Sequence, residues 1–230
     1  NFVWRYKYFK KIIKYYIWNN QYKETLKYLC ENVDGVKIGY YQSDEISLVL
    51  FNDSPKINKQ YWFDNKVEKI LTIATSICTA KFNSEYTKFG QFGAKEFGFF
   101  DARGFVVDTL DEVQEYLEWR VNDSIKNSVY LYAFDKVKDN SNPTKALMNK
   151  SVKEKIDLLK NEYGVDYYSF DSKYRKGIFY SKEYTTFVVK KEQYPEHLKE
   201  DKIVTRRKFK LHENFDKVAD IVDHFRMKGE

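Results

Sequence analysis

Residues 36–51 read VKIGYYQSDEISLVLF and contain two short runs of strand-forming residues. The runs Val36 to Tyr41 and Ile46 to Phe51 are rich in β-branched and aromatic side chains. The polar tetrapeptide Gln42-Ser43-Asp44-Glu45 separates them, as a turn separates the strands of an antiparallel hairpin. We therefore predict a β-hairpin whose tip carries two adjacent carboxylates.

Helical patterns flank this hairpin on both sides. Before it, apolar residues recur at helical spacing from Thr25 to the turn signal Asp34-Gly35. After it, the segment from Tyr61 to Asn83 places its apolar residues within one arc of a helix. Another helix is expected to begin at the capping box Thr109-x-x-Glu112 and to run to about Lys138.

The remaining elements alternate between strand and helix patterns. We expect a strand over 99–107, a helix from the capping box Ser151-x-x-Glu154 to Gly164, a hairpin of residues 178–180 and 185–190, a strand over 203–211 and a closing helix over 214–227. This order predicts an α+β fold with helices packed on one face of the sheet.

Composition bounds the class of protein. The chain has 230 residues, 43% of them hydrophobic, which indicates a globular protein. Its formal charge of +6 is compatible with an anionic partner, and an AT-rich genome is the alternative explanation for so many lysines. The loop near residues 139–144 predicts a boundary between an N-terminal domain over 1–140 and a C-terminal subdomain over 141–230. Cys30 and Cys78 have no metal or disulfide spacing, and no membrane span or signal peptide is evident, so we expect a cytoplasmic protein without membrane contact.

Asp44 is the leading candidate for a metal ligand. Mg²⁺ is a hard ion that is usually held by one or two carboxylates together with substrate phosphates. Because neighbouring side chains of a strand point to opposite faces, we assign the metal to Asp44 and a supporting catalytic role to Glu45. A solvated turn is the alternative for any Ser-Asp-Glu sequence.

Several cations could contact phosphate. Lys66 and Lys69 follow the hairpin and could neutralise triphosphate oxygens, although lysines commonly form a solvated face. Arg103 and Arg120 could each make a bidentate phosphate contact. Arg120 could equally pair with Asp123, three residues further along the same helix.

Two later motifs add candidates for contacts with RNA. Asn127 shares the helix face of Asp123 and could donate to a base or a sugar, or remain a solvated amide. Arg175 and Lys176 stand before Gly177 in a tight turn, where they could bind phosphate or simply protect a strand edge. The sequence shows no Ser-His-Asp arrangement, P-loop or zinc spacing.

Taken in order, five motifs resemble those of the tRNA-His guanylyltransferase family of 3′-to-5′ polymerases. They are Gly39-Tyr40-Tyr41-Gln42-Ser43-Asp44-Glu45-Ile46-Ser47, Trp62-Phe63 with Lys66 and Lys69, Phe100-Asp101-Ala102-Arg103, Trp119-Arg120 with Asp123 and Asn127, and Tyr174-Arg175-Lys176-Gly177. The resemblance covers the chain from about Thr25 to Gly177.

This resemblance implies a polymerase-palm-like (ferredoxin-type) antiparallel sheet with packed helices and a C-terminal α/β extension. It also implies two Mg²⁺ ions, GTP and ATP as substrates, tRNA as the partner and a tetrameric assembly. In such enzymes an NTP activates the 5′-monophosphate, and the 3′-hydroxyl of an incoming nucleotide then attacks the activated end. The implied roles are metal binding by Asp44, nucleotide binding by Ser43, Asp44, Lys66, Lys69, Arg103 and Asn127, and RNA or phosphate contact by Arg120, Lys126, Arg175 and Lys176.

Two stretches depart from the family pattern. The sequence Ile125-Lys126-Asn127-Ser128-Val129 stands where eukaryotic-type enzymes carry His-Ile-Asn-Asn-Leu-Tyr, and it is closer to the bacterial, archaeal and phage branch that repairs tRNA 5′ ends. No Arg-x-Asp-Gly motif, which supplies the other metal ligands in the family, precedes Thr25, so we expect the first palm strand to be missing or altered. A catalytically impaired tRNA-binding fragment and a nucleotide cyclase with a related palm are the alternatives.

Overall fold

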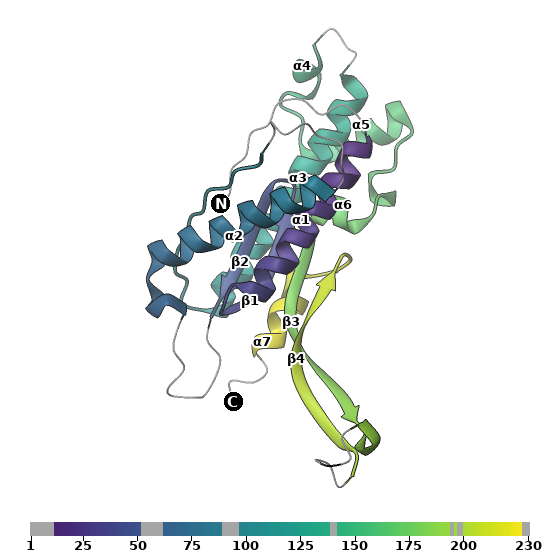
Figure 1. Cartoon of the computed structure of the whole chain (residues 1–230). Coiled ribbons are helices and arrows are strands. Elements are labelled where there is room, and N and C mark those ends of the chain that lie inside the picture. The colour runs from purple at the N-terminus through teal and green to yellow at the C-terminus, as the bar shows by residue number, and fades with distance from the viewer. Residues whose placement is uncertain are drawn as a thin grey trace.

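A computed structural model describes residues 12–51, 62–88, 97–138, 142–193, 196 and 200–226. In this part of the chain four antiparallel strands form one sheet in the order β2-β1-β3-β4 (Figure 1). The strands are β1 (Val36–Gln42), β2 (Glu45–Leu50), β3 (Ile178–Val189) and β4 (Lys202–His212). The predicted hairpin is confirmed, with its turn reduced to the two residues Ser43 and Asp44.

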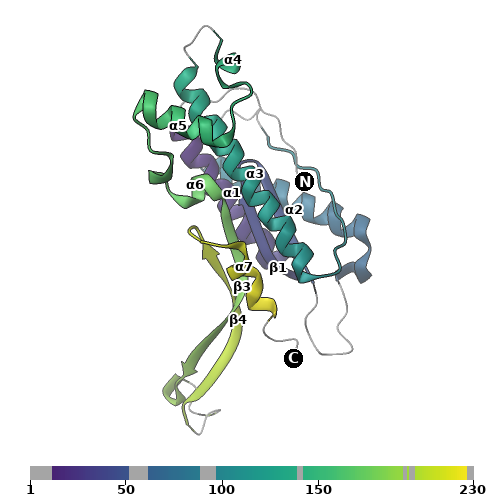
Figure 2. The ribbon, with the colours of Figure 1, turned by 180° about the vertical axis from the view of Figure 1, so that it is seen from behind.

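Helices cover both faces of the sheet, so the prediction of a single helical layer is wrong. On one face α1 (Ile12–Asn32) and α2 (Val67–Lys88) pack against Tyr41 and Ile46. On the other face α3 (Leu110–Val137) and α7 (Val218–Arg226) pack against Ile38 and Tyr40 (Figures 1 and 2). Because β1 is apolar on both sides, each of its faces has to be covered from water.

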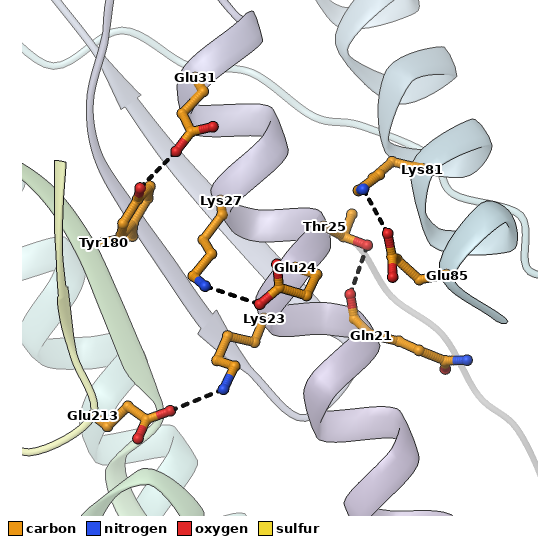
Figure 3. Close-up of polar contacts among 10 residues, drawn as sticks. All are labelled: Gln21, Lys23, Glu24, Thr25, Lys27, Glu31, Lys81, Glu85, Tyr180 and Glu213. Carbon is orange, nitrogen blue, oxygen red and sulfur yellow. Dashed lines mark hydrogen bonds and ion pairs between the residues drawn. The ribbon is translucent and has the colours of Figure 1, made fainter. Parts of the chain in front are cut away.

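Polar contacts hold α1 against the strands, as Figure 3 shows. The Tyr180 hydroxyl on β3 donates to Oε1 of Glu31 at 2.6 Å, and Nζ of Lys23 lies 3.3 Å from Oε1 of Glu213 just after β4. The helix begins at Ile12, earlier than the pattern from Thr25 suggested. The expectation of a missing first strand concerns residues 1 to about 22, of which 1–11 lie outside the described residues, and it stays a prediction.

The C-terminal half of α3 carries a second group of short helices. These are α4 (Pro143–Leu147), α5 (Val152–Tyr163), α6 (Ser172–Lys176) and the 3₁₀ turn η2 (Tyr167–Ser169). Both predicted capping boxes are confirmed, at Thr109 with Glu112 and at Ser151 with Glu154. Gly164 ends α5 in the left-handed conformation, also as predicted.

Three other elements differ from the predictions. The described segment 97–109 contains no strand, and Phe99 and Val106 are 64% and 85% exposed because their side chains do not lie on the sheet. Residues 178–190 do not form a hairpin, since β3 continues to Val189 and pairs along its length with β4. The backbone is left-handed at Phe63, Asp64 and Asn65, within the short turn η1 (Trp62–Asn65), and α2 begins only after this turn, at Val67.

Beyond the sheet, β3 and β4 form a two-stranded arm that projects away from the helices (Figures 1 and 2). Within the described sheet β1 pairs with β3 only over residues 178–181, so the rest of β3 pairs with β4 alone. The 3₁₀ turn η3 (Lys191–Gln193) follows β3. The two strands carry six lysine and arginine residues against one acidic residue, Glu183, which is buried. The arm is therefore a basic surface.

The sheet takes two strands from each side of residue 140. Its strands thus come from both of the domains predicted from the sequence, and the boundary itself stays a prediction. The closing helix is present as α7, although it begins at Val218 and not at Asn214.

Gly177 lies between α6 and β3, where the backbone leaves no room for a side chain, so a substitution there tests how tightly this part of the sheet is packed. Its φ is +83°, and a Cβ there would lie 2.5 Å from the Tyr41 carbonyl oxygen and 2.7 Å from the Tyr40 hydroxyl. We expect Gly177→Ala to lower the free energy of unfolding by about 3 kcal/mol, measured by urea denaturation.

Gly164→Ala is the matched control for this measurement. Its φ is +64°, but a Cβ would meet no atom within 4 Å, so only the left-handed backbone disfavours alanine. We expect a loss of about 1 kcal/mol. Equal losses for the two variants would contradict the packing argument.

Candidate nucleotide-binding site

The hairpin turn is the centre of the candidate site. Gln42 and Glu45 pair across it, and Ser43 adopts a left-handed conformation with φ of 56°. A two-residue turn of this kind requires positive φ because its twist has to match that of the strands. The Ser43 side chain is consequently exposed, and Asp44 is half-buried.

The two adjacent carboxylates lie on opposite faces of the hairpin, as strand geometry predicts. Glu45 is directed toward α3, where its carboxylate forms an ion pair with the Arg120 guanidinium. Ser47, two residues further along β2, faces the same helix, with its Oγ 3.0 Å from the Tyr116 hydroxyl. On the α1 side, burial raises the pKa of the Tyr22 phenol, and the charge of Asp44 raises it further.

Arg120 is enclosed by its neighbours. The residue is 4% exposed, and Nη1 lies 3.8 Å from Oδ2 of Asp123 in addition to the Glu45 contact. Its Cζ lies 4.7 Å from the ring centroid of Trp119, which covers the guanidinium. The ion pair with Asp123 considered from the sequence is present, and Glu45 is a second acidic partner. The contact of Arg120 with RNA stays a prediction.

An aromatic layer supports the Asp44 side of the turn. Tyr22 is 2% exposed and stacks on Tyr41, with ring centroids 5.1 Å apart and an interplanar angle of 6°. Phe82 and Phe100 lie against the same ring at 4.8 and 6.1 Å. Burial is the main cause that raises the pKa of Tyr22, and Asp44 adds to it. Sequence reasoning missed Tyr22 because the helical pattern was recognised only from Thr25.

Of the predicted nucleotide ligands, Lys66, Lys69 and Arg103 are exposed. Lys69 Nζ lies 4.6 Å from the ring centroid of Phe63, and Arg103 belongs to the extended segment that precedes α3. These side chains are accessible to a ligand, and their contact with a nucleotide stays a prediction.

The other candidates lie on α3. Asn127 and Lys126 are exposed there, and Asn127 Nδ2 donates to Oδ2 of Asp123 at 3.1 Å. Asp123 therefore links Asn127 to Arg120. A nucleotide that contacted Asn127 would lie next to the acidic and basic groups that hold the turn.

The turn containing Arg175 and Lys176 is fixed against β1 and α3. The Tyr40 hydroxyl donates to the Lys176 carbonyl at 2.6 Å, and Ser124 Oγ donates to the Arg175 carbonyl at 3.1 Å. Nζ of Lys176 donates to the Phe215 carbonyl at 3.2 Å. These bonds place the backbone of the basic motif against the strand that leads to the hairpin turn.

The donor set of the turn fits one hard cation. A carboxylate such as Asp44, combined with phosphate oxygens of a substrate, is the environment in which Mg²⁺ is usually held. Among the described residues no three histidine, cysteine or acidic side chains are placed to hold a metal together, and Glu45 is engaged by Arg120. Asp44 is therefore the carboxylate of the turn that we consider as a metal ligand, and the number of ions stays a prediction. In the described part of the chain, no helix is long and apolar enough to cross a membrane.

Two family models together match most of the chain. The model for tRNAHis guanylyltransferase matches residues 18–108, and the model for the Thg1 C terminal domain matches residues 111–223. This chain belongs to the tRNA-His guanylyltransferase family. The two matches leave out little more than the ends of the chain, and they include the hairpin turn, α3 and the basic arm.

Relatives within the tRNA-His guanylyltransferase family are distant. The tRNA(His) guanylyltransferase of Candida glabrata is 28% identical over 148 residues, which are 61% of this chain and 60% of that protein. A probable tRNA(His) guanylyltransferase of Drosophila melanogaster is 26% identical over 147 residues, 62% of this chain and 49% of that protein. The chain thus matches only about half to three fifths of the length of these curated relatives.

Solved structures of the family have the same mixed architecture of helices and antiparallel sheet. A bacterial tRNA(His) guanylyltransferase (Thg1)-like protein in complex with ATP superposes with a TM-score of 0.69 at 26% identity, covering 90% of this chain and 79% of that chain. A bacterial protein of the same description in complex with GTP gives a TM-score of 0.63 at 26% identity, covering 96% and 79%.

Proposed function

We propose that this chain is a nucleotidyltransferase that adds nucleotides to the 5′ end of tRNA in the 3′-to-5′ direction, after an NTP has activated the 5′-phosphate. The observation that carries the proposal is the Ser43–Asp44 turn, held between α1 and α3 in a chain of the tRNA-His guanylyltransferase family. Bacterial relatives of this fold have been solved with ATP and with GTP, which supports these two nucleotides as substrates.

In this proposal the turn positions the nucleotide. Glu45 and Arg120 fix the α3 side of the turn, so that Ser43 can donate to the triphosphate and Asp44 can face it. A divalent ion, when bound at Asp44, would offset the negative charge of the phosphates. Lys66, Lys69, Arg103 and Asn127 are proposed to bind the nucleotide, and Lys126, Arg175 and Lys176 to contact RNA or phosphate.

The finer expectations belong to the same proposal. Family membership supports a palm-like sheet, a tetramer and a cytoplasmic location. It also supports divalent-metal use, and the second Mg²⁺ ion would need ligands beyond the described side chains. The bacterial-type sequence around Lys126 favours repair of shortened 5′ ends over strict addition of one guanosine to tRNA-His.

The direct test is incorporation of labelled GTP into a tRNA that lacks its first nucleotide and carries a 5′-monophosphate, with and without Mg²⁺. Mg²⁺-dependent incorporation at the 5′ end supports the proposal. Binding of the tRNA without incorporation would identify an impaired tRNA-binding member of the family. A cyclic product formed from NTP alone would identify a nucleotide cyclase.

The basic arm supports tRNA as the partner, because lysines and arginines that neutralise phosphates release counterions. Arg206 and Lys208 lie on one face of the arm, each over the ring of Phe187. We expect the Arg206→Gln/Lys208→Gln variant to bind tRNA more weakly and to lower the magnitude of the slope of log K against log salt by about 1.4 to 1.8.

Lys153→Gln/Lys160→Gln on α5 is the control, since it removes the same charge from an exposed helix outside the arm. We expect this pair of substitutions to leave the salt slope nearly unchanged. If both double variants weakened binding equally, net charge and not the arm would govern tRNA affinity.

A further inference from the structure

We propose that Tyr168 and Arg175 form a stacking platform for an unpaired nucleotide of RNA. Tyr168 is 65% exposed, whereas the adjacent Tyr167 is 1% exposed and belongs to the core between α3 and α5. A large aromatic side chain that is held outward beside a buried neighbour is available to a ligand. This proposal depends on the proposed function in one respect only, namely that RNA is the partner of the chain.

Tyr168 is held at its backbone, and its ring packs on Tyr167, before any ligand arrives. Asp166 caps the 3₁₀ turn by accepting from the Tyr168 backbone N–H at 3.0 Å. The ring packs edge-on against Tyr167, with centroids 5.4 Å apart and an interplanar angle of 73°. Tyr167 is in turn anchored by its hydroxyl, 2.7 Å from Ser128 Oγ on α3. An aromatic ring that is already ordered loses little conformational entropy when a base stacks on it.

Arg175 supplies a cation beside this ring. Its Cζ lies 5.8 Å from the ring centroids of both Tyr167 and Tyr168. Nε of Arg175 donates to the Phe170 carbonyl at 2.8 Å, which holds the guanidinium in place. An exposed aromatic face next to a fixed cation is the combination by which proteins bind single-stranded nucleic acid, because the base stacks and the phosphate meets the charge.

The platform is joined to the candidate site through α6. The carbonyl of Arg175 accepts from Ser124 on α3, and the next carbonyl, that of Lys176, accepts from Tyr40 on β1. Tyr40 lies on the strand that ends at the Ser43–Asp44 turn. A nucleotide stacked on Tyr168 would therefore be held by the same rigid unit that positions the turn.

The acidic residues near the platform are engaged in local contacts. Asp166 caps the turn, and Oδ2 of Asp171 lies 3.8 Å from Lys173 Nζ. In these contacts, neither Asp166 nor Asp171 forms an ion pair with Arg175. This arrangement favours an anionic, aromatic ligand such as a nucleotide over an acidic or purely apolar protein surface.

The test compares Tyr168→Ala with Tyr168→Phe in the full chain. The probes are a 12-nucleotide unstructured RNA that contains 2-aminopurine and a 12-base-pair RNA duplex. We expect Tyr168→Ala to weaken single-strand binding about 5- to 100-fold without changing the salt slope, because stacking carries no charge. Tyr168→Phe should stay within about two-fold of the native affinity, since it keeps the ring face.

Two further measurements separate stacking from charge and from folding. Arg175→Gln should lower both the affinity and the salt slope, the slope by about 0.7, as loss of one phosphate contact to a single strand does. Because Tyr168 is exposed, its alanine variant should keep the native urea midpoint.

Three outcomes would overturn the platform. One is equal affinity of the alanine and native chains for the single strand, and another is an equal loss for the duplex. The third is an absence of 2-aminopurine quenching in the native complex. None of these requires catalysis, so a chain that incorporates nucleotides but fails here would lose only the platform. A chain that stacks RNA but incorporates nothing would lose only the proposed activity.

Discussion

Asp44→Asn is expected to reduce 5′ nucleotide incorporation into shortened tRNA by about 100- to 1000-fold, the usual effect of removing one electrostatic group from a reacting site. Asparagine keeps the size of the side chain but cannot offset cationic groups or hold a divalent ion as a carboxylate does. The backbone of the turn is defined by the left-handed Ser43 and the Gln42–Glu45 pair, and asparagine has the shape of the side chain that it replaces. Activity should therefore fall while the urea midpoint stays close to that of the native chain.

Asp135→Asn is the control for this experiment. Asp135 is an exposed carboxylate on α3 that pairs with Lys138 at 2.8 Å, and α3 also carries Arg120. Its replacement should leave incorporation within about two-fold, as surface substitutions usually do. Turnover that survives in Asp44→Asn would exclude Asp44 from the reaction and direct attention to another carboxylate.

Arg120→Met is expected to lower the free energy of unfolding by about 3 kcal/mol or more. The substitution removes the cation that faces Glu45 and leaves a largely buried carboxylate without its ion-pair partner. Replacing both residues, as Glu45→Leu/Arg120→Met, should restore much of the lost stability, because two apolar side chains leave no buried charge. Urea denaturation of the native chain, the single variants Glu45→Leu and Arg120→Met, and the double variant gives the coupling energy directly.

The Asp135–Lys138 pair is the matched control for the double-mutant cycle. It joins residues three apart on the same helix, but both side chains are more than half exposed, and we expect a coupling of about 0.5 kcal/mol or less. A cycle at Glu45 and Arg120 that gave no larger coupling would mean that water reaches the pair. The turn would then be held by its backbone alone.

The sequence correctly predicted those parts of the fold that are determined by residues close together in the chain. The β1–β2 hairpin, the two capping boxes and the end of α5 at Gly164 depend on residues a few positions apart. The predictions that failed concern segments whose structure depends on residues far away in the sequence. Residues Ser181 to Glu183 look polar enough for a turn, yet they continue β3 because β4 offers a partner to each of them. The segment 99–107 has strand composition, but no strand in the described part of the chain pairs with it.

In the candidate site, too, the sequence predicts the features that depend on neighbouring residues and misses those that depend on tertiary packing. Residue types and order predict that Asp44 and Glu45 face different ways, because alternation along a strand is a local rule, and Glu45 does face α3. The role of Asp44 as a metal ligand stays a prediction. The partner of Glu45 could not be chosen from the sequence, where Asp123 was the obvious neighbour of Arg120. Tyr22 was missed entirely, since its place beside Asp44 depends on how α1 crosses the sheet.

The position of β1 between β2 and β3 also determines how the chain can fold as it is synthesised. One edge of β1 is paired as soon as the hairpin forms, but the other waits for β3, and the Tyr40–Lys176 hydrogen bond spans 136 residues. At about 5–20 residues per second, the open edge leaves the ribosome roughly 7 to 27 s before its partner. During that interval the strand that leads to the Ser43–Asp44 turn has one unpaired edge, the kind of surface to which other chains add. Closing this large loop, and not forming the hairpin, is then the slow step that completes the molecule.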